Sequence, residues 1–448
     1  MIPQLRALEH EFADVLAIIG VHSPKFPAEK VPANVRAAVQ RLGVDHAVVS
    51  DVEFDIWQAY GVRAWPTLMF IDPAGRVFGV HEGEFPLDAV REMVRDALAS
   101  YSADGELDRR PLPHTPLPPG GGQLRFPGKV LTDSTSNRLF IADTGHHRIL
   151  VADTNGAVSM AVGAGTAGFQ DGAAGEAQFN HPQGMALAAG GSRLQVADTA
   201  NHAIREINLA TGDVTTLAGT GEQGRARSGG PARAIPLSSP WDIVWHGHQL
   251  WIAMAGLHQL WTLDPETGTV AIAAGTGAES IHDGSLADAT FAQPSGITTT
   301  GEALFVADSE SSAIRRVAPL ADRVQRLVGR GLFTFGDLDG QGDAVRLQHP
   351  LGVCAVMEQD APVVYLADSY NDKIKRLDPR TRRVETLFEH GAFDGASASP
   401  AGSPFWEPGG LCISSQVCYV ADTNNHAIRR ANLASGEITT LPLGAAAI

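Results

Sequence analysis

Short apolar stretches, each long enough for one strand, recur along the last three quarters of the chain. In one repeating unit they lie at Gly184–Ala188, Arg193–Ala197, Ala203–Asn208 and Val214–Leu217. Short polar turns separate the four stretches, and a longer glycine-rich loop follows the last of them. Strand-length stretches bounded by turn residues predict an antiparallel sheet of four strands in each unit.

An eight-residue segment, which we call the octet, marks the units. Its copies are Ala142–Ile149, Ala197–Ile204, Ala253–Leu260, Ala307–Ile314, Ala367–Ile374 and Ala421–Ile428. They recur every 54 to 60 residues, and four strands in a unit of this length are typical of a β-propeller blade. The sequence therefore predicts a six-bladed ring, with blades at about residues 125–165, 180–220, 238–276, 292–330, 348–388 and 406–444.

The first 101 residues show a different pattern, in which helical and strand periodicities alternate. Helices are predicted at Ile2–Ala13, Pro32–Leu42, Val52–Tyr60 and Pro86–Tyr101, and strands at Val15–Val21, His46–Ser50, Thr67–Asp72 and Arg76–His81. The first and third strands are apolar, so we expect them to be buried on both faces. Residues 102–122 are rich in proline and glycine and predict a linker between this α/β domain, residues 1–101, and the propeller, residues 123–448.

The order of these first elements resembles the thioredoxin fold. The segment Ala64–Thr67 precedes the hairpin, and the resemblance implies a cis bond before Pro66 and places Trp65, Pro66 and Thr67 beside a redox dithiol. The first strand and the CxxC motif of that family are missing, and residues 1–353 contain no cysteine. Either the start is clipped and a CxxC lies upstream, or the domain is redox-inactive. We expect a clipped start, because losing a central strand would unpair two ladders of backbone groups.

The propeller units resemble NHL repeats. Units begin with Pro-x-Gly, as at Pro182–Gly184, Pro294–Gly296 and Pro350–Gly352, continue with a strand that ends in Ala-Asp, and then read His/Asn-x-Ile-Arg or a close variant. Together the two regions resemble NHL-repeat-containing proteins with an N-terminal thioredoxin-like domain. Blade three departs from the pattern, because Met254 replaces the aspartate and four tryptophans gather there. They are Trp241, Trp245, Trp251 and Trp261. If one sector of the propeller rim is specialised, we expect it in this blade.

Five octets carry an aspartate, and three of these five also carry a histidine at a matching position. They are Asp143, Asp198, Asp308, Asp368 and Asp422, with His147, His202 and His426. The octets and the Asp-Gly loops at 171–172, 283–284, 339–340 and 394–395 are predicted to share one rim, where carboxylates could bind a cation or ligand. The alternative is turn chemistry, in which each aspartate accepts from a backbone N–H two residues on. Repetition in five blades favours turn chemistry, since a site needs few residues while a fold needs each copy.

A basic side chain follows four of the octets. The four are Arg205, Arg315, Lys375 and Arg429. They could bind an anionic ligand or form ion pairs between blades, and their repetition favours ion pairs. The sequence has no metal-ligating histidine spacing, phosphate loop or nucleotide fingerprint, so no metal or cofactor is predicted. Cys412 and Cys418 bracket a predicted turn, where two free thiols are expected rather than a strained cross-strand disulfide.

Composition narrows the function classes. The formal charge of −16 argues against nucleic-acid and anionic-membrane partners, and no apolar run is long enough to span a bilayer. The N-terminus lacks a signal-peptide pattern, and three cysteines in 448 residues favour a reducing, cytoplasmic compartment. We predict a monomeric, non-catalytic scaffold that binds a protein or peptide on the loop-rich propeller face. The alternatives are a thiol–disulfide oxidoreductase with an upstream CxxC and a propeller hydrolase or lyase acting at the channel mouth.

Overall fold

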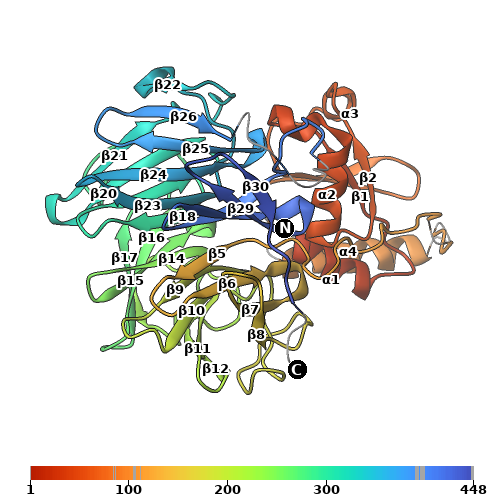
Figure 1. Cartoon of the computed structure of the whole chain (residues 1–448). Coiled ribbons are helices and arrows are strands. Elements are labelled where there is room, and N and C mark those ends of the chain that lie inside the picture. The colour runs from red at the N-terminus through yellow and green to blue at the C-terminus, as the bar shows by residue number, and fades with distance from the viewer. Residues whose placement is uncertain are drawn as a thin grey trace. The chain divides into compact units, whose positions relative to one another are not determined.

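Two compact units make up the chain, Met1–Gly120 and Gly121–Ile448. The computed structural model describes residues 2–83, 85, 87–103, 107–110, 112–388, 393 and 399–444. Figure 1 traces the chain by colour, from the red and orange first unit through the strands of the second. Across the described ranges, no helix is both long and apolar enough to cross a membrane.

Twenty-four strands form the blades of the second unit. Blade one contains β5 (Val130–Asp133), β6 (Arg138–Asp143), β7 (Arg148–Asp153) and β8 (Val158–Val162). Blade two contains β9 (Pro182–Leu187), β10 (Arg193–Asp198), β11 (Ala203–Asn208) and β12 (Val214–Ala218). Blade three contains β14 (Pro240–His246), β15 (Gln249–Met254), β16 (Gln259–Asp264) and β17 (Thr269–Ala274). Blade four contains β18 (Pro294–Thr299), β19 (Leu304–Asp308), β20 (Ala313–Ala318) and β21 (Arg323–Val328). Blade five contains β23 (Gly352–Glu358), β24 (Ala361–Asp368), β25 (Lys373–Asp378) and β26 (Arg383–Leu387). Blade six contains β27 (Pro408–Ser414), β28 (Val417–Asp422), β29 (Ala427–Asn432) and β30 (Ile438–Thr440).

These strands form a six-bladed β-propeller, as the octet period predicted. Every blade is an antiparallel sheet of consecutive strands, and short strands β13 (Gly230–Pro231) and β22 (Gly340–Gln341) extend the outer edges of blades three and five. The first strand of each blade is innermost. In Figure 1 the inner strands β9, β14, β18 and β23 lie nearer the middle of the propeller than the outer strands β12, β21 and β26.

Six apolar layers, one between each pair of neighbouring blades, form the propeller core. The side chains of each strand alternate between the two faces of its blade and so contribute to two layers. The ring closes through the layer between blades six and one, where Val130 and Ile141 pack with Tyr419 and Ile428. Each described blade is complete in itself, so this layer and the hydrogen bonds around it hold the ring shut.

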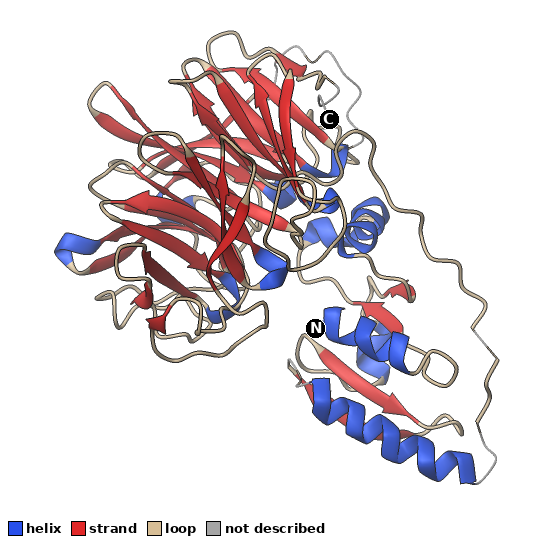
Figure 2. Cartoon of the chain, turned by 90° about the horizontal axis from the view of Figure 1, so that it is seen from below, coloured by secondary structure: helices blue, strands red, loops and turns tan. Residues whose placement is uncertain are grey.

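The first unit contains the longer helices among those that Figure 2 draws in blue, beside a few strands. Its elements are α1 (Ile2–Glu11), β1 (Ile19–His22), α2 (Pro32–Leu42), β2 (Ala47–Ser50), α3 (Asp55–Ala59), β3 (Thr67–Ile71), β4 (Val77–Glu82) and α4 (Leu87–Ala103), with a 3-10 turn at Pro27–Lys30. β1 and β2 form a parallel pair, and β3 and β4 form an antiparallel pair. Leu8 and Phe12 pack with Phe85, Val90 and Val94 in a separate small core.

The prediction that two strands of this unit are buried on both faces is wrong. Val15 and Leu16 lie in a turn that continues α1, since both N–H groups donate to the Phe12 carbonyl. The strand begins only at Ile19, which is 56% exposed. β3 is likewise only partly covered, with Ile71 exposed. Among the described residues each of these strands pairs on one edge only, so neither has the flanking strand that a fully buried strand requires.

Candidate functional site

Each octet forms the turn between the second and third strands of its blade. In blade two, Thr199–Asn201 makes one 3-10 turn, and His202 follows it with φ 51°. The residues at this sixth octet position all have a positive φ and close the turn. They are His147, His202, His258, Ser312, Asp372 and His426. The turn therefore has the same shape in all six blades, including the divergent blade three.

The five octet aspartates are fully buried, and each ties the turn to the loop that leads into its own blade. Asp198 Oδ1 accepts from the backbone N–H of Asn180 at 2.7 Å. The corresponding pairs are Asp143 with Arg125, Asp308 with Ala292, Asp368 with Gln348 and Asp422 with Trp406. The expectation of a donor two residues on is wrong, because the Ala200 N–H at that position donates to the Asn180 carbonyl. The carboxylate instead reaches a donor 18 residues earlier.

The basic residues after the octets neutralise four of these carboxylates, and Arg148, inside its octet, pairs with the fifth, Asp143. Arg205 Nη1 lies 2.8 Å from Asp198 Oδ2, and Arg205 Nη2 lies 2.8 Å from Asp171 in the Asp-Gly loop. The other pairs repeat this arrangement. They are Arg315 with Asp308 and Asp283, Lys375 with Asp368, Asp337 and Asp339, and Arg429 with Asp422. The Asp394–Gly395 loop lies outside the described residues. The ion pairs thus join the octet to a loop rather than to a ligand.

Burial and pairing leave the aspartate ring unsuited to bind a cation. Burial raises the pKa of Asp198 and of Asp368 to about 6, even though Arg205 and Lys375 oppose the shift. Neither carboxylate is exposed. Within the described part of the chain, no three His, Cys, Asp or Glu side chains are grouped closely enough to hold a metal ion. The octet aspartates are therefore parts of the frame.

A first set of hydrogen bonds joins each octet to the next blade. His147 Nδ1 accepts from the backbone N–H of His181, the residue before the first proline of blade two, at 3.2 Å. The corresponding pairs are His202 with Ser239, His258 with Gln293, Ser312 with His349, Asp372 with Glu407 and His426 with Phe126. All six donors have a positive φ and precede a proline. The last pair links blade six to blade one and so helps to close the ring.

A second set uses the third octet position. Thr199 Oγ1 donates to the carbonyl of Pro240 in the next blade at 2.7 Å. Thr144, Ser309, Ser369 and Thr423 make the same bond to Pro182, Pro350, Pro408 and Pro127. Ala255 replaces the hydroxyl in blade three, which lacks this bond. We call these two sets of interblade hydrogen bonds the clasps. They were not foreseen from the sequence.

Blade three exchanges the buried ion pair for apolar packing. Met254 takes the place of the aspartate and Trp261 that of the arginine, and both are fully buried in one layer with blade two. Trp251 packs in the opposite layer, with blade four. Trp241 and Trp245 are half-buried, and Trp245 Nε1 donates to Gln195. The tryptophans therefore fall on different faces of the blade, and a specialised rim sector in blade three stays a prediction.

A second ring of equivalent residues lies at the propeller axis. In each blade the residue is two positions after the first proline, where Pro-x-Gly has its glycine. The six residues are Lys129, Gly184, Asp242, Gly296, Gly352 and Gly410. The inner strands approach so closely that a Cβ on Gly352 would lie 2.8 Å from Gly410 Cα. Glycine is required there because any side chain would meet the neighbouring backbone.

Lys129 and Asp242 close the axis. Lys129 Nζ lies 3.3 Å from Asp242 Oδ2 and donates to the carbonyls of Ser295 and Leu351 at 3.0 and 2.7 Å. One ammonium group therefore joins four blades. Both side chains are buried, and burial lowers the pKa of Lys129 and raises that of Asp242. The buried Lys129–Asp242 pair thus occupies the propeller axis at this level.

Comparison with known proteins agrees with the repeat pattern. The chain is 42% identical over 482 residues to the human "NHL repeat-containing protein 2" and to its bovine counterpart, and the match covers 99% of the chain. The chain belongs to the NHL repeat-containing protein family. The chain spans 66% of the length of these two relatives, so the activity of the whole relative is not assigned to it. No protein-family model matches the chain.

Two further similarities cover most of this NHL repeat-containing protein. It is 40% identical over 468 residues to "Protein SUPPRESSOR OF QUENCHING 1, chloroplastic" from Arabidopsis thaliana, which covers 99% of the chain and 44% of that protein. A solved auxiliary nutrient binding protein from Bacteroides thetaiotaomicron aligns at 14% identity with a TM-score of 0.49, over 72% of this chain and 71% of that one.

The residues singled out in the first unit lie together in one small cluster. The Trp65–Pro66 bond is cis, and Thr67 Oγ1 donates to the Ala64 carbonyl at 2.7 Å. Trp65 Nε1 donates to the Ser23 carbonyl, and its ring lies 4.5 Å from that of Trp57. Trp65 is 47% exposed, so an apolar ring of this cluster faces solvent.

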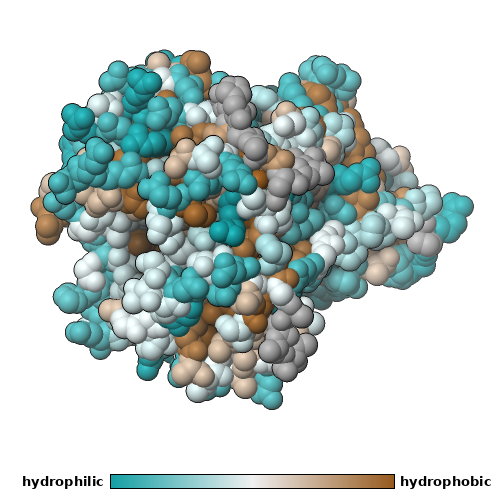
Figure 3. Space-filling view, in the orientation of Figure 1, coloured by the Kyte–Doolittle hydropathy of each residue, from teal (hydrophilic) through white to brown (hydrophobic). Residues whose placement is uncertain are grey.

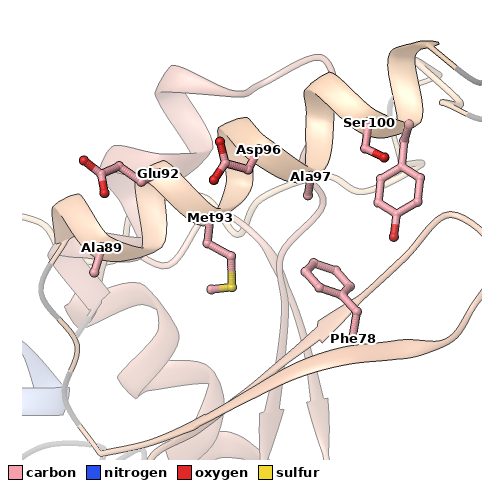
Figure 4. A pocket seen from close by; sticks show the side chains of 8 residues that line it. Phe78, Ala89, Glu92, Met93, Asp96, Ala97 and Ser100 are labelled. Atoms are coloured by element: carbon pink, nitrogen blue, oxygen red, sulfur yellow. The ribbon is translucent and has the colours of Figure 1, made fainter.

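A separate crevice of about 490 Å³ lies between α4 and β4. Figure 4 shows Phe78 and Met93 facing one another across it, while Glu92 and Asp96 point away from it. None of the site residues predicted from the sequence lines this crevice. It is open, and its apolar floor belongs to the packing between the helix and the hairpin.

The histidine clasps of this NHL propeller should make its stability depend on pH. Burial, with His181 and Arg125 nearby, lowers the pKa of His147 to about 4. Its Nδ1 must stay unprotonated to accept from His181. A folded pKa below the unfolded value gives stability that is present above about pH 6.5 and is lost as pH falls toward 4.

The expected result is a difference between the wild type and His147→Asn. Asparagine tolerates the positive φ and keeps an acceptor that does not titrate. Between about pH 7 and pH 5, the free energy of unfolding of the wild type should fall by about 1–2 kcal/mol more than that of the variant, as measured by urea unfolding. Parallel pH profiles for the two proteins would show that His147 does not act as a neutral acceptor.

Proposed function

We propose that this NHL propeller is a monomeric scaffold that binds a protein or peptide partner on its loop-rich face. The observation that supports this proposal is a difference between the octets and the loops on that face. The octet side chains form the buried clasps and ion pairs, whereas the loops beside them carry exposed apolar side chains. The loop between blades four and five holds Phe333, which is 73% exposed, and Leu338, which is 55% exposed.

This loop lies against the octet of blade five. Asn371 Nδ2 donates to the Gly336 carbonyl at 2.8 Å, and Lys373 and Lys375 pair with Asp337. The frame therefore presents the apolar residues at the rim on a fixed backbone. Exposed apolar anchors surrounded by charged groups are typical of protein interfaces. On the face drawn in Figure 3, apolar residues lie in small patches among polar ones, which suits a few anchors better than a broad apolar interface.

The test compares two surface variants of the full chain. Phe333→Ser with Leu338→Ser removes the proposed anchors, and Leu320→Ser is the matched control. Leu320 is fully exposed but lies in the 3-10 turn between β20 and β21, at the opposite end of its blade from the octet. Partners captured by the wild type and identified by mass spectrometry should be lost with the double variant and kept with the control.

The affinity of a purified partner for each protein is then measured directly to test whether this loop is the binding surface. The double variant should weaken the binding by at least about tenfold, because anchors near the centre of an interface carry most of its binding free energy. Equal affinity for the wild type and the double variant would exclude this loop as the binding surface. A cytoplasmic location stays a prediction, and the Arabidopsis relative is named as chloroplastic.

A second candidate, a thiol–disulfide oxidoreductase with its CxxC upstream of Met1, is favoured by the strands of the first unit. β1 pairs only with β2, and β3 only with β4, among the described residues. Ile19 and Val80 are apolar yet more than half exposed. A strand between the two pairs, as in a thioredoxin-like domain, would supply the missing ladders and cover these side chains. Trp65, Pro66 and Thr67 would then lie beside the dithiol.

Reduction of insulin by the chain extended upstream tests this candidate. The extended protein should be active, and replacing the first cysteine of its CxxC by serine should abolish the activity. A stop codon directly upstream of Met1, or an extended chain without a cysteine pair, would sink the idea.

A further inference from the structure

All three cysteines of the chain gather at one place near the propeller axis, although 64 positions separate the first from the last. Cys354 lies on β23 in blade five, and Cys412 and Cys418 lie on β27 and β28 in blade six. The Ile413 N–H donates to Cys354 Sγ at 3.4 Å, which places that sulfur beside the next residue along from Cys412. Thr132 Oγ1, from blade one, lies 3.0 Å from Cys412 Sγ. Two thiols of adjacent blades thus face one another at the seam of the ring.

Cys418 is not part of this pair. In the ladder between β27 and β28, Cys412 is opposite Tyr419, and Cys418 is opposite Ile413. Neighbouring positions of a strand point to opposite faces of the sheet. Cys418 accordingly packs with Leu411 and Val420 in the layer between blades five and six, and Cys412 lies in the layer between blades six and one. All three thiols are free.

The environment separates the thiols chemically. The Cys354 thiol and the Thr132 hydroxyl stabilise the thiolate of Cys412 and lower its pKa to about 7. Burial raises the pKa of Cys418 well above its usual range. A thiolate is the form that reacts with peroxides, so Cys412 is the reactive cysteine and Cys418 is inert. Cys354 is partly exposed, which gives a small oxidant a way in.

We propose that Cys354 and Cys412 are a peroxide-sensitive pair that forms a disulfide between blades five and six. The Cys412 thiolate attacks the O–O bond of hydrogen peroxide, giving a sulfenic acid and hydroxide. The Cys354 thiol then attacks the sulfenic sulfur, the S–S bond forms, and the hydroxyl leaves as water. Two thiols and one peroxide become one disulfide and two waters.

The disulfide would fix the two inner strands beside the seam where blade six meets blade one. That seam is held by the layer of Val130 and Tyr419, by the clasps from Thr423 and His426, and by the Gly444 N–H, which donates to the Gly156 carbonyl. A covalent link between blades five and six therefore restricts their separation beside this seam. This inference concerns the frame and does not depend on the identity of any partner.

The experiment treats the full chain with hydrogen peroxide, alkylates the remaining thiols and maps the peptides by mass spectrometry. The wild type should lose about 2 Da before alkylation, keep one alkylatable cysteine and yield a peptide joining Cys354 to Cys412. Cys418→Ser should form the same link. Cys354→Ala and Cys412→Ala should form none, and alanine is the native residue at the matching position of blade two, Ala186. The oxidised wild type should unfold at a higher urea concentration than the reduced protein, and oxidised Cys354→Ala should show no such increase.

Several outcomes would overturn the proposal. One is three alkylatable cysteines in the folded wild type after peroxide treatment. Another is a link between Cys412 and Cys418, and a third is a disulfide found only between two chains on a non-reducing gel. Circular dichroism of the alanine variants shows whether they fold, and the Cys418→Ser protein decides the question even if they do not.

Discussion

Replacing Asp198 by alanine should lower the free energy of unfolding by about 3–5 kcal/mol. Arg205 and Asp198 pair at 2.8 Å, and neither side chain is exposed. The substitution leaves the guanidinium buried with Asp171, which is itself partly exposed, as its remaining carboxylate. The Asn180 N–H also loses its acceptor. Equilibrium unfolding in urea, followed by tryptophan fluorescence, measures the change.

Blade three supplies the matched controls, because Met254 and Trp261 occupy the positions of Asp198 and Arg205. Met254→Leu exchanges one apolar side chain for another of similar volume and should cost less than about 1.5 kcal/mol. The double variant Asp198→Met with Arg205→Trp copies blade three and should be more stable than Asp198→Met alone, since no charge stays unpaired. A loss for Asp198→Ala no larger than that for Met254→Leu would refute the structural role of the aspartates.

Lys129→Met should also cost about 3–5 kcal/mol, because it leaves Asp242 buried at the axis without its cation. The hydrogen bonds from Lys129 to blades four and five are lost as well. The same urea measurement applies. The effect should be larger than that of a lysine on the propeller surface, where substitutions usually change stability by less than about 0.5 kcal/mol.

Adding Asp242→Gly to Lys129→Met provides the control. Four blades carry glycine at this axial position, so the backbone there accepts it. Removing the second charge should recover at least half of the loss, although the Ile297 N–H then lacks its carboxylate acceptor. If the free energy of unfolding of Lys129→Met lies within about 1 kcal/mol of the wild-type value, the axial pair does not hold the blades together.

The propeller could be predicted from the sequence because its signal is local and repeated. The octet, the Pro-x-Gly segment and four apolar stretches recur together, and each copy supports the same assignment. The basic residue after the octet forms an ion pair, but with carboxylates of its own blade and of the loop that leads into it rather than between blades as expected. Its partners could not all be predicted, because Asp171 and Asp198 reach Arg205 from a loop and a turn that the sequence does not place in space.

Residues far apart in sequence account for what was missed. Lys129 and Asp242 meet only because the ring brings blades one and three to the same axis. Their departure from Pro-x-Gly was a visible signal, since the other four blades carry glycine at that position. The clasps went unnoticed because the acceptors of the first set vary between His, Ser and Asp, and the acceptors of the second set are backbone carbonyls. The tryptophans of blade three are close in sequence but lie on different faces, which the sequence alone did not show.

The first unit shows the limit of apolar patterning. Val15–Val21 contains almost only apolar residues, and such a run does not distinguish a buried strand from a helix end followed by an exposed strand. Whether Ile19 is covered depends on which strand lies beside it, and that is a question of long-range pairing. The thioredoxin-like assignment of this unit stays a proposal.

The central claim is that the octet joins blades rather than binding a ligand, and the stability of Thr423→Val tests it most directly. Thr423 Oγ1 donates to the Pro127 carbonyl at 2.8 Å across the seam between blades six and one, and valine keeps the shape of threonine but removes the donor. We predict a loss of about 1–2 kcal/mol in urea unfolding with unchanged partner capture. Unchanged stability together with lost partner capture would contradict the account.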